Sequence, residues 1–305
     1  ESKIDFTKTQ EWKQNQVVNK LTGGVELLLK KHKVEIVRGE AYFNDNETVN
    51  VINGDDSHVY RFKRALIATG SRPVEIPHFK FSGRVIDSTG ALNLKDVPEH
   101  LIIIGGGVIG AELAGAYMNL GSKITIIEGL DHILNGFDGE LIQPVLNNFK
   151  KNGVEIVTEA TAVEANQTDK DVTVTYEADG TTKTVTGDYC LVSVGRRPNT
   201  DQLGLNNTNI KLSKRGLIEI NDSMQTSVKH IYAIGDVVAG PALAHKASFE
   251  AKVAAAAMGG EDAHDTHYVL PAVAYTNIEL ATVGETPQSI AEKKLDAKSS
   301  KFPFA

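Results

Sequence analysis

The chain has 305 residues and a formal net charge of −7, and 41% of its residues are hydrophobic and 23% charged. These values are ordinary for a globular protein with room for two domains, and the acidic balance gives no electrostatic case for nucleic acid as a partner. No apolar run approaches a membrane span, no signal-peptide pattern opens the chain, and its single cysteine excludes an internal disulfide. We therefore expect a cytoplasmic protein.

The first predicted element is a helix over residues 1–33, where apolar side chains recur at helical spacing. Thr7 fits the first position of a capping box, and Trp12 is expected to anchor packing. The Gly23-Gly24 pair interrupts the apolar stripe, so a kink or break is expected there. We interpret the segment as a packing helix.

Short strands follow this helix. Alternating and β-branched residues predict strands at 34–37, 41–43, 48–52, 60–62 and 64–67. The last strand ends in Ala68, Thr69 and Gly70, three small residues that either let a ligand approach the backbone or form a plain turn. The residues alone leave both interpretations open.

The most informative stretch is an apolar strand at Leu101–Ile104 that runs into a G-x-G-x-x-G turn made by Gly105, Gly107 and Gly110. A helical pattern follows over Val108–Leu120. Gly105 permits a sharp bend, Gly107 lets a pyrophosphate approach the backbone, and Gly110 lets the helix lie close to the strand. The helix N-terminus then faces the phosphates. The pattern favours a dinucleotide site over a glycine-rich turn of another α/β domain.

A second strand at residues 124–127 ends at Glu128, 21 residues after Gly107. At this distance the carboxylate of a dinucleotide-binding unit hydrogen-bonds the adenosine ribose 2′-hydroxyl. The carboxylate would repel a 2′-phosphate, and no arginine in residues 129–132 would compensate. The sequence therefore predicts NAD(H) rather than NADP(H).

The α/β alternation continues after Glu128. A helix is predicted at 139–150, strands at 154–157 and 189–195, and a meander at 161–185 that turns at Asp179-Gly180. Cys190 lies inside an apolar strand and is interpreted as a small hydrophobe rather than a nucleophile. Arg196–Asn199 follows that strand, either at the ligand crevice of an open sheet or as a solvated basic turn, and both remain open.

An edge strand is predicted at 216–220, and a buried strand at 230–236 ends in small and acidic residues. Asp236 at this strand-to-helix junction is well placed to accept a sugar or ribitol hydroxyl. Pro241 is expected at the first position of the following helix. His245 by itself is more typical of a packed side chain than of a catalyst.

One polar loop contains a metal-like set of side chains, namely Asp262, His264, Asp265 and His267. No cysteine and histidine spacing of the zinc type accompanies it. We therefore favour a solvated loop and expect no metal.

The order and spacing of three strand ends, at Ala68–Gly70, Gly195–Asn199 and Gly235–Asp236, resemble those of the flavoprotein disulfide reductases that bind two dinucleotides. The segment Thr226–Asp236 is similar to the second flavin motif of that family. The resemblance covers essentially the whole chain. It implies both NAD and FAD as cofactors.

Within the family, Glu128 and residues 133–138 and 243–247 are most similar to the members that oxidise dihydrolipoyl groups. Such a parent protein is expected to pass electrons through a cysteine pair and FAD and to end with hydride transfer to NAD+. The implied partners are the lipoyl-bearing proteins of 2-oxoacid dehydrogenase complexes. The implied assembly is a homodimer.

The resemblance also implies a role for each candidate residue. It assigns to the NAD site Gly105, Gly107, Val108, Ile109, Gly110, Glu128 and, on the nicotinamide side, Gly195. It assigns to the FAD site Ala68, Thr69, Gly70, Asp236 on the ribitol side, and Ala244 with His245 near the ring. Glu112 matches the family glutamate near both rings, which pairs there with an upstream lysine.

The chain also departs from the family pattern. The first G-x-G-x-x-G motif, the redox cysteine pair and the acid–base histidine are absent, and the interface domain stops shortly after residues 271–277. Asn135 stands where proline is usual, and Asn277-Ile278 where Asp-Pro is usual. We therefore expect a fragment, truncated at both ends, that binds NAD(H) and catalyses little or nothing, so no catalytic residue is assigned.

The predicted fold is α/β. A Rossmann-like NAD-binding domain at 97–222 is inserted in a partial FAD-binding domain at 1–96 and 223–268, and the start of an α+β interface domain follows at 269–305. The alternatives are a fragment of an NADH oxidase, a peroxidase or a mercuric reductase of the same family, or a non-catalytic NAD(H)-binding module.

Overall fold

The computed structural model describes residues 4–265 and 269–302. Its internal contacts divide the chain into two compact units. Unit 1 comprises residues 1–74 and 195–268, and unit 2 comprises residues 75–194 and 269–305. Each unit is therefore built from two separate stretches of the chain.

The chain passes between the two units after residues 74 and 194, earlier than the domain boundaries predicted at residues 96 and 222. The packing of the intervening segments explains the difference. Phe79 and Val85 pack into the core of unit 2, so the connection before residue 97 belongs to that core. Leu205 and Ile218 pack into a core of unit 1, so the segment before residue 223 belongs there. Contacts alone do not assign cofactors, and the functional domain assignment stays a prediction.

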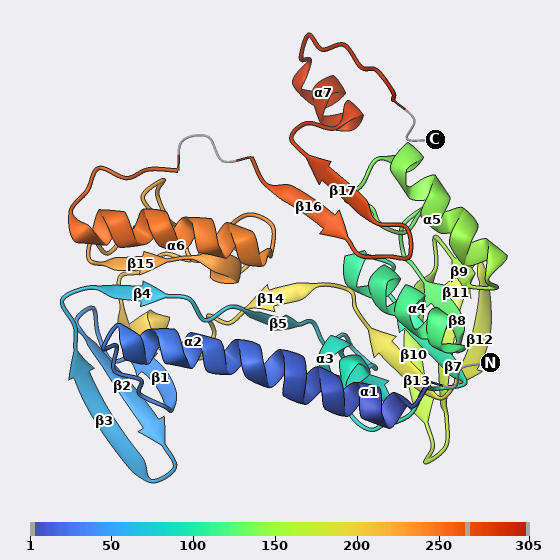
Figure 1. Cartoon of the computed structure of the whole chain (residues 1–305), viewed down its shortest axis with the longest axis horizontal. Coiled ribbons are helices and arrows are strands. Elements are labelled where there is room, and N and C mark those ends of the chain that lie inside the picture. The colour runs from blue at the N-terminus through green and yellow to red at the C-terminus, as the bar shows by residue number, and fades with distance from the viewer. Residues whose placement is uncertain (1–3, 266–268, 303–305) are drawn as a thin grey trace. The chain divides into compact units, whose positions relative to one another are not determined.

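Unit 2 is built on a five-stranded parallel sheet. Most of its strands are labelled in Figure 1. Its strands, in spatial order, are β6 (Val85–Ile86), β13 (Tyr189–Val192), β7 (His100–Ile104), β8 (Lys123–Ile127) and β9 (Glu155–Val157). Leu101, Ile102 and Ile103 are fully buried because helices or strands cover both faces of the sheet. The fold class predicted from the sequence is confirmed.

The helices of unit 2 that follow β7 and β8 are α4 (Val108–Leu120) and α5 (Gly139–Lys151). Gly121 ends α4 in the left-handed conformation at φ 101°, which glycine adopts without steric cost. The Asp138 side chain caps α5 by accepting a hydrogen bond from the Glu140 amide. The connection β7–α4–β8 is therefore the parallel crossover that the glycine motif predicted, and β8–α5–β9 is a second one, formed by the helix and strand predicted at 139–150 and 154–157.

The predicted meander is confirmed as an antiparallel sheet of β10 (Thr161–Gln167), β11 (Val172–Ala178) and β12 (Thr181–Gly187). Its inward side chains, such as Val172 and Val174, share one hydrophobic core with Ile102 and Cys190 of the parallel sheet. The remaining elements of unit 2 are α3 (Ser88–Leu92), β16 (Pro271–Ala274), β17 (Leu280–Val283) and α7 (Pro287–Lys293).

Unit 1 combines three small sheets with helices. The strands pair as β1 (Glu40–Phe43), β2 (Thr48–Asn53) and β3 (Asp56–Arg61), antiparallel; β4 (Ala65–Ile67) with β15 (Ile231–Ala233), parallel; and β5 (Ser71–Pro73) with β14 (Arg196–Pro198), antiparallel. The helical segments are α1 (Phe6–Trp12), the π-helix η1 (Lys13–Val18), α2 (Asn19–Lys31), the 3₁₀ turns η2 (Leu205–Asn207) and η3 (Gly235–Val237), and α6 (Ala244–Gly259).

The N-terminal helix corrects three predictions. Its cap is Asp5, whose carboxylate accepts from the Lys8 amide, and not Thr7. The Gly23-Gly24 pair lies inside a continuous α2, since the irregularity falls earlier, in the π-helical turn. Trp12 is 61% exposed and anchors no core in this unit.

Three further predictions of local structure are wrong. Residues 34–37 lie outside the named strands, because no neighbouring strand pairs with them in the described part of the chain. Residues 216–220 form isolated bridges through Ile218 and Ile220 instead of a strand. Pro241 precedes α6, whose N-cap is Leu243.

The polar loop near residue 262 has no regular secondary structure and is held by hydrogen bonds. His264 lies 2.7 Å from Asp262 and 3.4 Å from Asp222, while His267 is outside the described residues. Across the described ranges, no group of three or more His, Cys, Asp or Glu side chains is arranged to hold a metal ion. No helix in those ranges is long and apolar enough to cross a membrane.

Candidate functional site

The glycine turn of unit 2 is packed at the backbone level. Gly105 has φ 95°, and a Cβ there would lie 2.7 Å from the Ser193 carbonyl oxygen. A Cβ at Gly110 would lie 2.0 Å from the Gly105 carbonyl oxygen, so only glycine lets α4 approach β7 this closely. The Ser193 hydroxyl donates to the Gly105 carbonyl at 2.9 Å and thereby holds the turn in place.

Gly107, by contrast, faces open space. No heavy atom lies within 4 Å of a Cβ built on it, and it is the N-cap of α4. Val108 and Ile109 are the first two residues of α4, where backbone N–H groups lack partners within the helix. Free donors, positive helix-dipole charge and free space on the side of Gly107 fit the pyrophosphate of a dinucleotide.

The carboxylate of Glu128 lies beside this turn and is only 8% exposed. Its Oε2 accepts from the Gly106 amide at 2.6 Å, and its Oε1 accepts from the Leu130 amide at 2.9 Å. Ile133 packs against Gly106, where a Cβ would lie 2.3 Å from the Ile133 Cγ2. Two backbone donors therefore fix the carboxylate at the point where an adenosine ribose would reach the turn.

Glu112 contacts the β16–β17 hairpin of unit 2. Its Oε1 accepts from the Tyr275 amide at 2.7 Å. One face of α4 also carries Asn119, whose amide exchanges two hydrogen bonds with Asn277, at 2.6 and 2.9 Å. Asn277, which stands where the family pattern has aspartate, thus has a partner that matches an amide, because a carboxylate could not donate to Asn119.

In unit 1, Asp236 lies in the short turn η3 that follows β15. The Ser71 hydroxyl donates to its carboxylate at 2.5 Å. Arg196 in turn donates to the Ser71 hydroxyl through Nε at 2.7 Å and to the Ser71 carbonyl through Nη2 at 2.7 Å. The carboxylate predicted for a ribitol hydroxyl is therefore oriented from β5 and β14, two strands that are far away in sequence.

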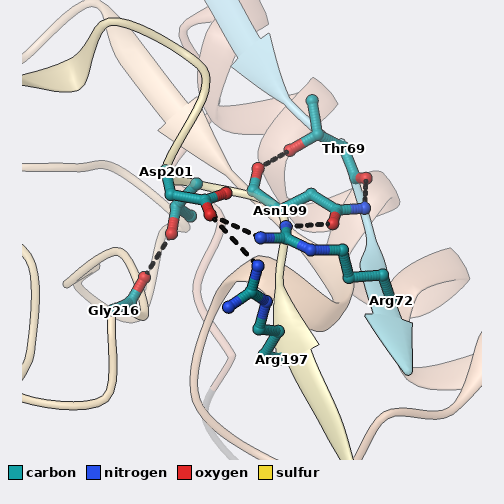
Figure 2. Close-up of polar contacts among 7 residues, drawn as sticks. Thr69, Arg72, Arg197, Asn199, Asp201 and Gly216 are labelled. Atoms are coloured by element: carbon teal, nitrogen blue, oxygen red, sulfur yellow. Dashed lines mark hydrogen bonds and ion pairs between the residues drawn. The ribbon is translucent and has the colours of Figure 1, made fainter. Parts of the chain in front are cut away.

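The small-residue turn after β4 is joined to the segment after β14, as Figure 2 shows. Thr69 donates through its hydroxyl to the Asn199 carbonyl at 2.9 Å, and the Asn199 side-chain amide donates to the Thr69 carbonyl at 3.0 Å. The Asn199 backbone amide also donates to the Gly70 carbonyl at 2.9 Å. The segments Ala68–Gly70 and Arg196–Asn199, whose roles the sequence left open, are thus joined by three hydrogen bonds.

The arginines of this region hold the same structure together (Figure 2). Arg72 donates to the Asn199 side-chain oxygen at 2.8 Å and pairs with Asp201, and Arg197 lies 3.5 Å from the same carboxylate. The hydrogen bond from Arg72 keeps the pKa of Asp201 below its ordinary value. Arg72 and Arg197 therefore carry charge that Asp201 compensates.

The remaining candidates are placed within unit 1. Ala244 is the first residue of α6, and Gly195, at φ 136°, accepts a hydrogen bond from the Val74 amide through its carbonyl. The structure thus brings one set of candidates together around the α4 N-terminus of unit 2. It gathers a second set around β4, β5 and η3 of unit 1.

Thiol chemistry has no support in this chain. Its single cysteine, Cys190, is fully buried, and desolvation raises the pKa of the thiol to about 12. Burial likewise raises the pKa of Tyr117 to about 12, and its hydroxyl donates to the Ala91 carbonyl. Both groups are neutral components of the core. The prediction that Cys190 is a buried small residue is confirmed.

Sequence reasoning missed the side chains that hold the two turns. Ser193 and Ser71 are single hydroxyls, and their partners Gly105 and Asp236 lie 88 and 165 residues away in sequence. The one local signal was that each serine stands beside a strand end that the sequence had identified. Only the three-dimensional structure shows these hydrogen bonds.

Comparison with known proteins connects this geometry to a family. Residues 2–251 match the model of the family described as pyridine nucleotide-disulphide oxidoreductase. The dihydrolipoyl dehydrogenase of Geobacillus stearothermophilus is 56% identical over 302 residues, and that of Trypanosoma brucei brucei is 40% identical over 309 residues. Each match covers 99% of this chain and 64% of the relative, so the chain spans slightly less than two thirds of these relatives.

Solved structures agree with this result. LpdA from Mycobacterium tuberculosis superposes with a TM-score of 0.90 at 26% identity, covering 97% of this chain and 66% of that one. The HOCl-induced flavoprotein disulfide reductase RclA from Escherichia coli, as its Cu(II) complex, gives a TM-score of 0.87 at 27% identity, over 96% and 66% of the two chains. The chain belongs to the pyridine nucleotide-disulphide oxidoreductase family.

Proposed function

We propose that this chain is the nicotinamide-nucleotide-binding part, with a portion of the flavin-binding part, of a dihydrolipoyl dehydrogenase. The whole protein would oxidise dihydrolipoyl groups with NAD+ through FAD and a cysteine pair. The observation that carries the proposal is the packed glycine turn at the α4 N-terminus with the buried Glu128 carboxylate beside it. The 56% identity to dihydrolipoyl dehydrogenases favours that member over the RclA-like reductases, at 27%.

The proposed roles follow from the contacts of each residue. The amides at the start of α4, beside Gly107, hold the pyrophosphate, and Glu128 accepts hydrogen bonds from the adenosine ribose. Gly105 and Gly110 keep α4 against β7. Because the two donors on Glu128 come from Gly106 and Leu130, the carboxylate is oriented before a nucleotide arrives.

The flavin portion of the proposal rests on unit 1. Asp236, oriented by Ser71, accepts a ribitol hydroxyl, and the turn of Ala68, Thr69 and Gly70 approaches the cofactor with little steric bulk. FAD, when bound, supplies the two-electron relay between a dithiol and the nicotinamide. These residues supply part of a flavin site, since the chain contains one G-x-G-x-x-G motif, and that motif lies in unit 2.

Further parts of the proposal concern the cellular context. Lipoyl-bearing proteins of 2-oxoacid dehydrogenase complexes are the proposed partners of the whole protein, which would act as a homodimer in the cytoplasm. This chain alone is proposed to be inactive in dihydrolipoamide oxidation, because the thiol of its single cysteine is buried and protonated. NAD-dependent oxidation of dihydrolipoamide by the purified chain would contradict that statement.

A fluorescence titration with NADH and NADPH tests the nucleotide proposal. We expect NADH to bind at least about 10-fold more tightly than NADPH, because the Glu128 carboxylate repels a 2′-phosphate. Glu128→Gln removes the charge and replaces one of the two oxygens that accept from the Gly106 and Leu130 amides with an NH2 group. It should raise the Kd for NADH about 10-fold, since a hydrogen bond to a charged group contributes about 1.5 to 3 kcal/mol. Equal affinity of the parent chain for the two nucleotides would refute the assignment of Glu128.

A further inference from the structure

Two oppositely charged side chains are buried one helical turn apart in unit 1. Lys246 and Glu250 on α6 are 4% and 5% exposed, and the Lys246 Nζ lies 2.7 Å from the Glu250 Oε1. Charged side chains are rarely this buried unless they are paired and hydrogen-bonded. Such a pair adds little net stability compared with apolar side chains of the same size. The pair therefore calls for a reason other than stability.

Both side chains also hold the same residue of the turn η3. The Glu250 Oε2 accepts from the Gly235 amide at 2.7 Å, and the Lys246 Nζ donates to the Gly235 carbonyl at 3.1 Å. The N–H and C=O groups of one residue are thus both bound by a single ion pair. Gly235 is the residue immediately before Asp236.

The turn needs this external support for two physical reasons. It is a single 3₁₀ turn of three residues, Gly235–Val237, a type of element with poor internal hydrogen-bond geometry. Gly235 also has φ 75°, a left-handed conformation that glycine adopts readily. Because glycine adopts other backbone conformations just as readily, the residue type alone does not select this one. The two contacts from α6 select one of these alternatives.

The packing around Lys246 shows how closely the pair fits. A Cβ at Gly240 would lie 2.6 Å from the Lys246 Cε, so the backbone passes directly over the lysine stem. A Cβ at Gly235 would lie 3.3 Å from the Ala247 Cβ. The ion pair, the turn and the start of α6 are therefore closely packed against one another.

We propose that Lys246 and Glu250 are positioning residues of the partial flavin site around Asp236. They bind the C=O and N–H groups of Gly235 and thereby orient the Asp236 carboxylate toward its ligand. This inference rests on the proposed role of Asp236. It goes beyond that role by assigning the orientation of Asp236 to an ion pair that does not itself contact the ligand.

The test compares two neutral double variants of the chain. Lys246→Met/Glu250→Met removes the ion pair and both contacts to Gly235. Lys246→Met/Glu250→Gln also removes the ion pair, but its amide oxygen can still accept from the Gly235 N–H. Hydrogen exchange is measured at the amides of residues 235–237, with the β15 amides of residues 231–233 as the reference, and FAD affinity is measured by quenching of flavin fluorescence.

We expect the Met/Met variant to exchange at least about 10-fold faster at residues 235–237 with little change in β15, and to bind FAD about 10-fold more weakly. The Met/Gln variant, which keeps one of the two contacts to Gly235, should lie between the parent chain and the Met/Met variant in both measurements. Equal acceleration at 231–233 and 235–237 in the Met/Met variant would overturn the proposal, because the pair would then act on global stability. Unchanged FAD affinity in that variant would also overturn it.

The two measurements distinguish a failure of the proposed FAD site from a failure of the role given to the ion pair. If the parent chain binds no FAD, the role of Asp236 fails, while the exchange data still decide whether the pair holds Gly235. If the Met/Met variant does not fold, Glu250→Asp replaces it, because its shorter side chain keeps the charge but cannot reach the Gly235 amide. Faster exchange confined to residues 235–237 supports the proposal there, and parent-like exchange contradicts it.

Discussion

The turn after β7 in unit 2 and the turn after β15 in unit 1 are held in different ways. In unit 2, the turn Gly105–Gly110 is fixed by backbone packing so close that a Cβ at Gly110 would lie 2.0 Å from a carbonyl oxygen. In unit 1, the turn Gly235–Val237 is fixed by side chains, namely Ser71 on Asp236 and the ion pair Lys246–Glu250 on Gly235. The Ser193 hydroxyl and the Glu128 carboxylate add hydrogen bonds to the first turn, but its close packing requires residues that lack a side chain, whereas the second turn is held by hydrogen bonds from side chains.

The difference follows from the sheets beneath the turns. The turn in unit 2 lies at the end of β7, the central strand of five parallel strands, whose position is fixed by neighbours on both sides. The turn in unit 1 follows β15, which has β4 as its one partner strand in the described part of the chain and only an isolated bridge, between Tyr232 and Gln225, on its other side. A strand with fewer neighbours positions its terminus less firmly, and polar side chains take over that task.

The largest expected effect comes from adding one methyl group to the packed turn. Gly110→Ala should destabilise the chain by about 3 kcal/mol or more, because its Cβ collides with backbone rather than with a flexible side chain. Gly107→Ala is the matched control, since its Cβ meets no atom within 4 Å. Urea unfolding should show a loss only for Gly110→Ala.

The same pair of variants separates folding from binding. Gly107→Ala should keep parental stability and lose NADH affinity, because its methyl group occupies the space of the pyrophosphate. Full NADH affinity in Gly107→Ala would contradict the role of Gly107 in binding the pyrophosphate. Parental stability in Gly110→Ala would contradict the account of the unit 2 turn as fixed by backbone packing.

A smaller effect is expected in unit 1, where the turn is held by several separate contacts. Ser71→Ala removes the donor to Asp236 and the acceptor for Arg196, and should cost about 1 to 2 kcal/mol. Ser248→Ala is the control, because that hydroxyl bonds only within its own helix and alanine favours helix. If both variants unfold at the parental urea midpoint, Ser71 does not hold the turn.

The smallest effect concerns pH and an exposed loop of unit 1. The hydrogen bond with Asp262, followed by that with Asp222, raises the pKa of His264 above its ordinary value. The folded state thus favours the charged histidine. Its stabilising contribution is complete below about pH 6.5, the ordinary pKa, and is lost as the pH rises through the raised pKa of the folded state.

Amide exchange checks this dependence at Asp265, whose N–H donates to the Asp222 carbonyl at 2.7 Å. After correction for the intrinsic rate, protection of Asp265 should fall in the parent chain as the pH rises above about 6.5, through the raised pKa of His264. His264→Gln, which cannot be charged, should show no such fall. A parent chain with constant protection would rule out the contribution of His264.

The part of this architecture that the sequence predicts is the part carried by local pattern. Glycine spacing and the distance to Glu128 identified the turn of unit 2, because each glycine answers a backbone requirement next to it in the chain. The meander at 161–185 was also predicted correctly, since alternation of apolar and polar residues and an Asp-Gly turn are local signals.

Apart from local errors at helix ends and at Gly23-Gly24, the errors and omissions concern what depends on distant partners. Residues 34–37 have a strand pattern without a neighbouring strand in the described ranges, and Trp12 has a core-like side chain that lies exposed. Lys246 and Glu250 have the spacing of an exposed helical pair, yet both are buried because they bind Gly235. Tertiary contacts decide such cases, and a single sequence contains no record of them.

The most direct test of the difference between the two turns is hydrogen exchange of the parent chain with NADH and, separately, with FAD. We predict that NADH protects the amides of residues 105–110 and 128–130, and that FAD protects those of residues 67–71 and 235–237. Protection of the unit 1 turn by NADH, or protection of the same amides by both nucleotides, would contradict the assignment of one turn to each cofactor.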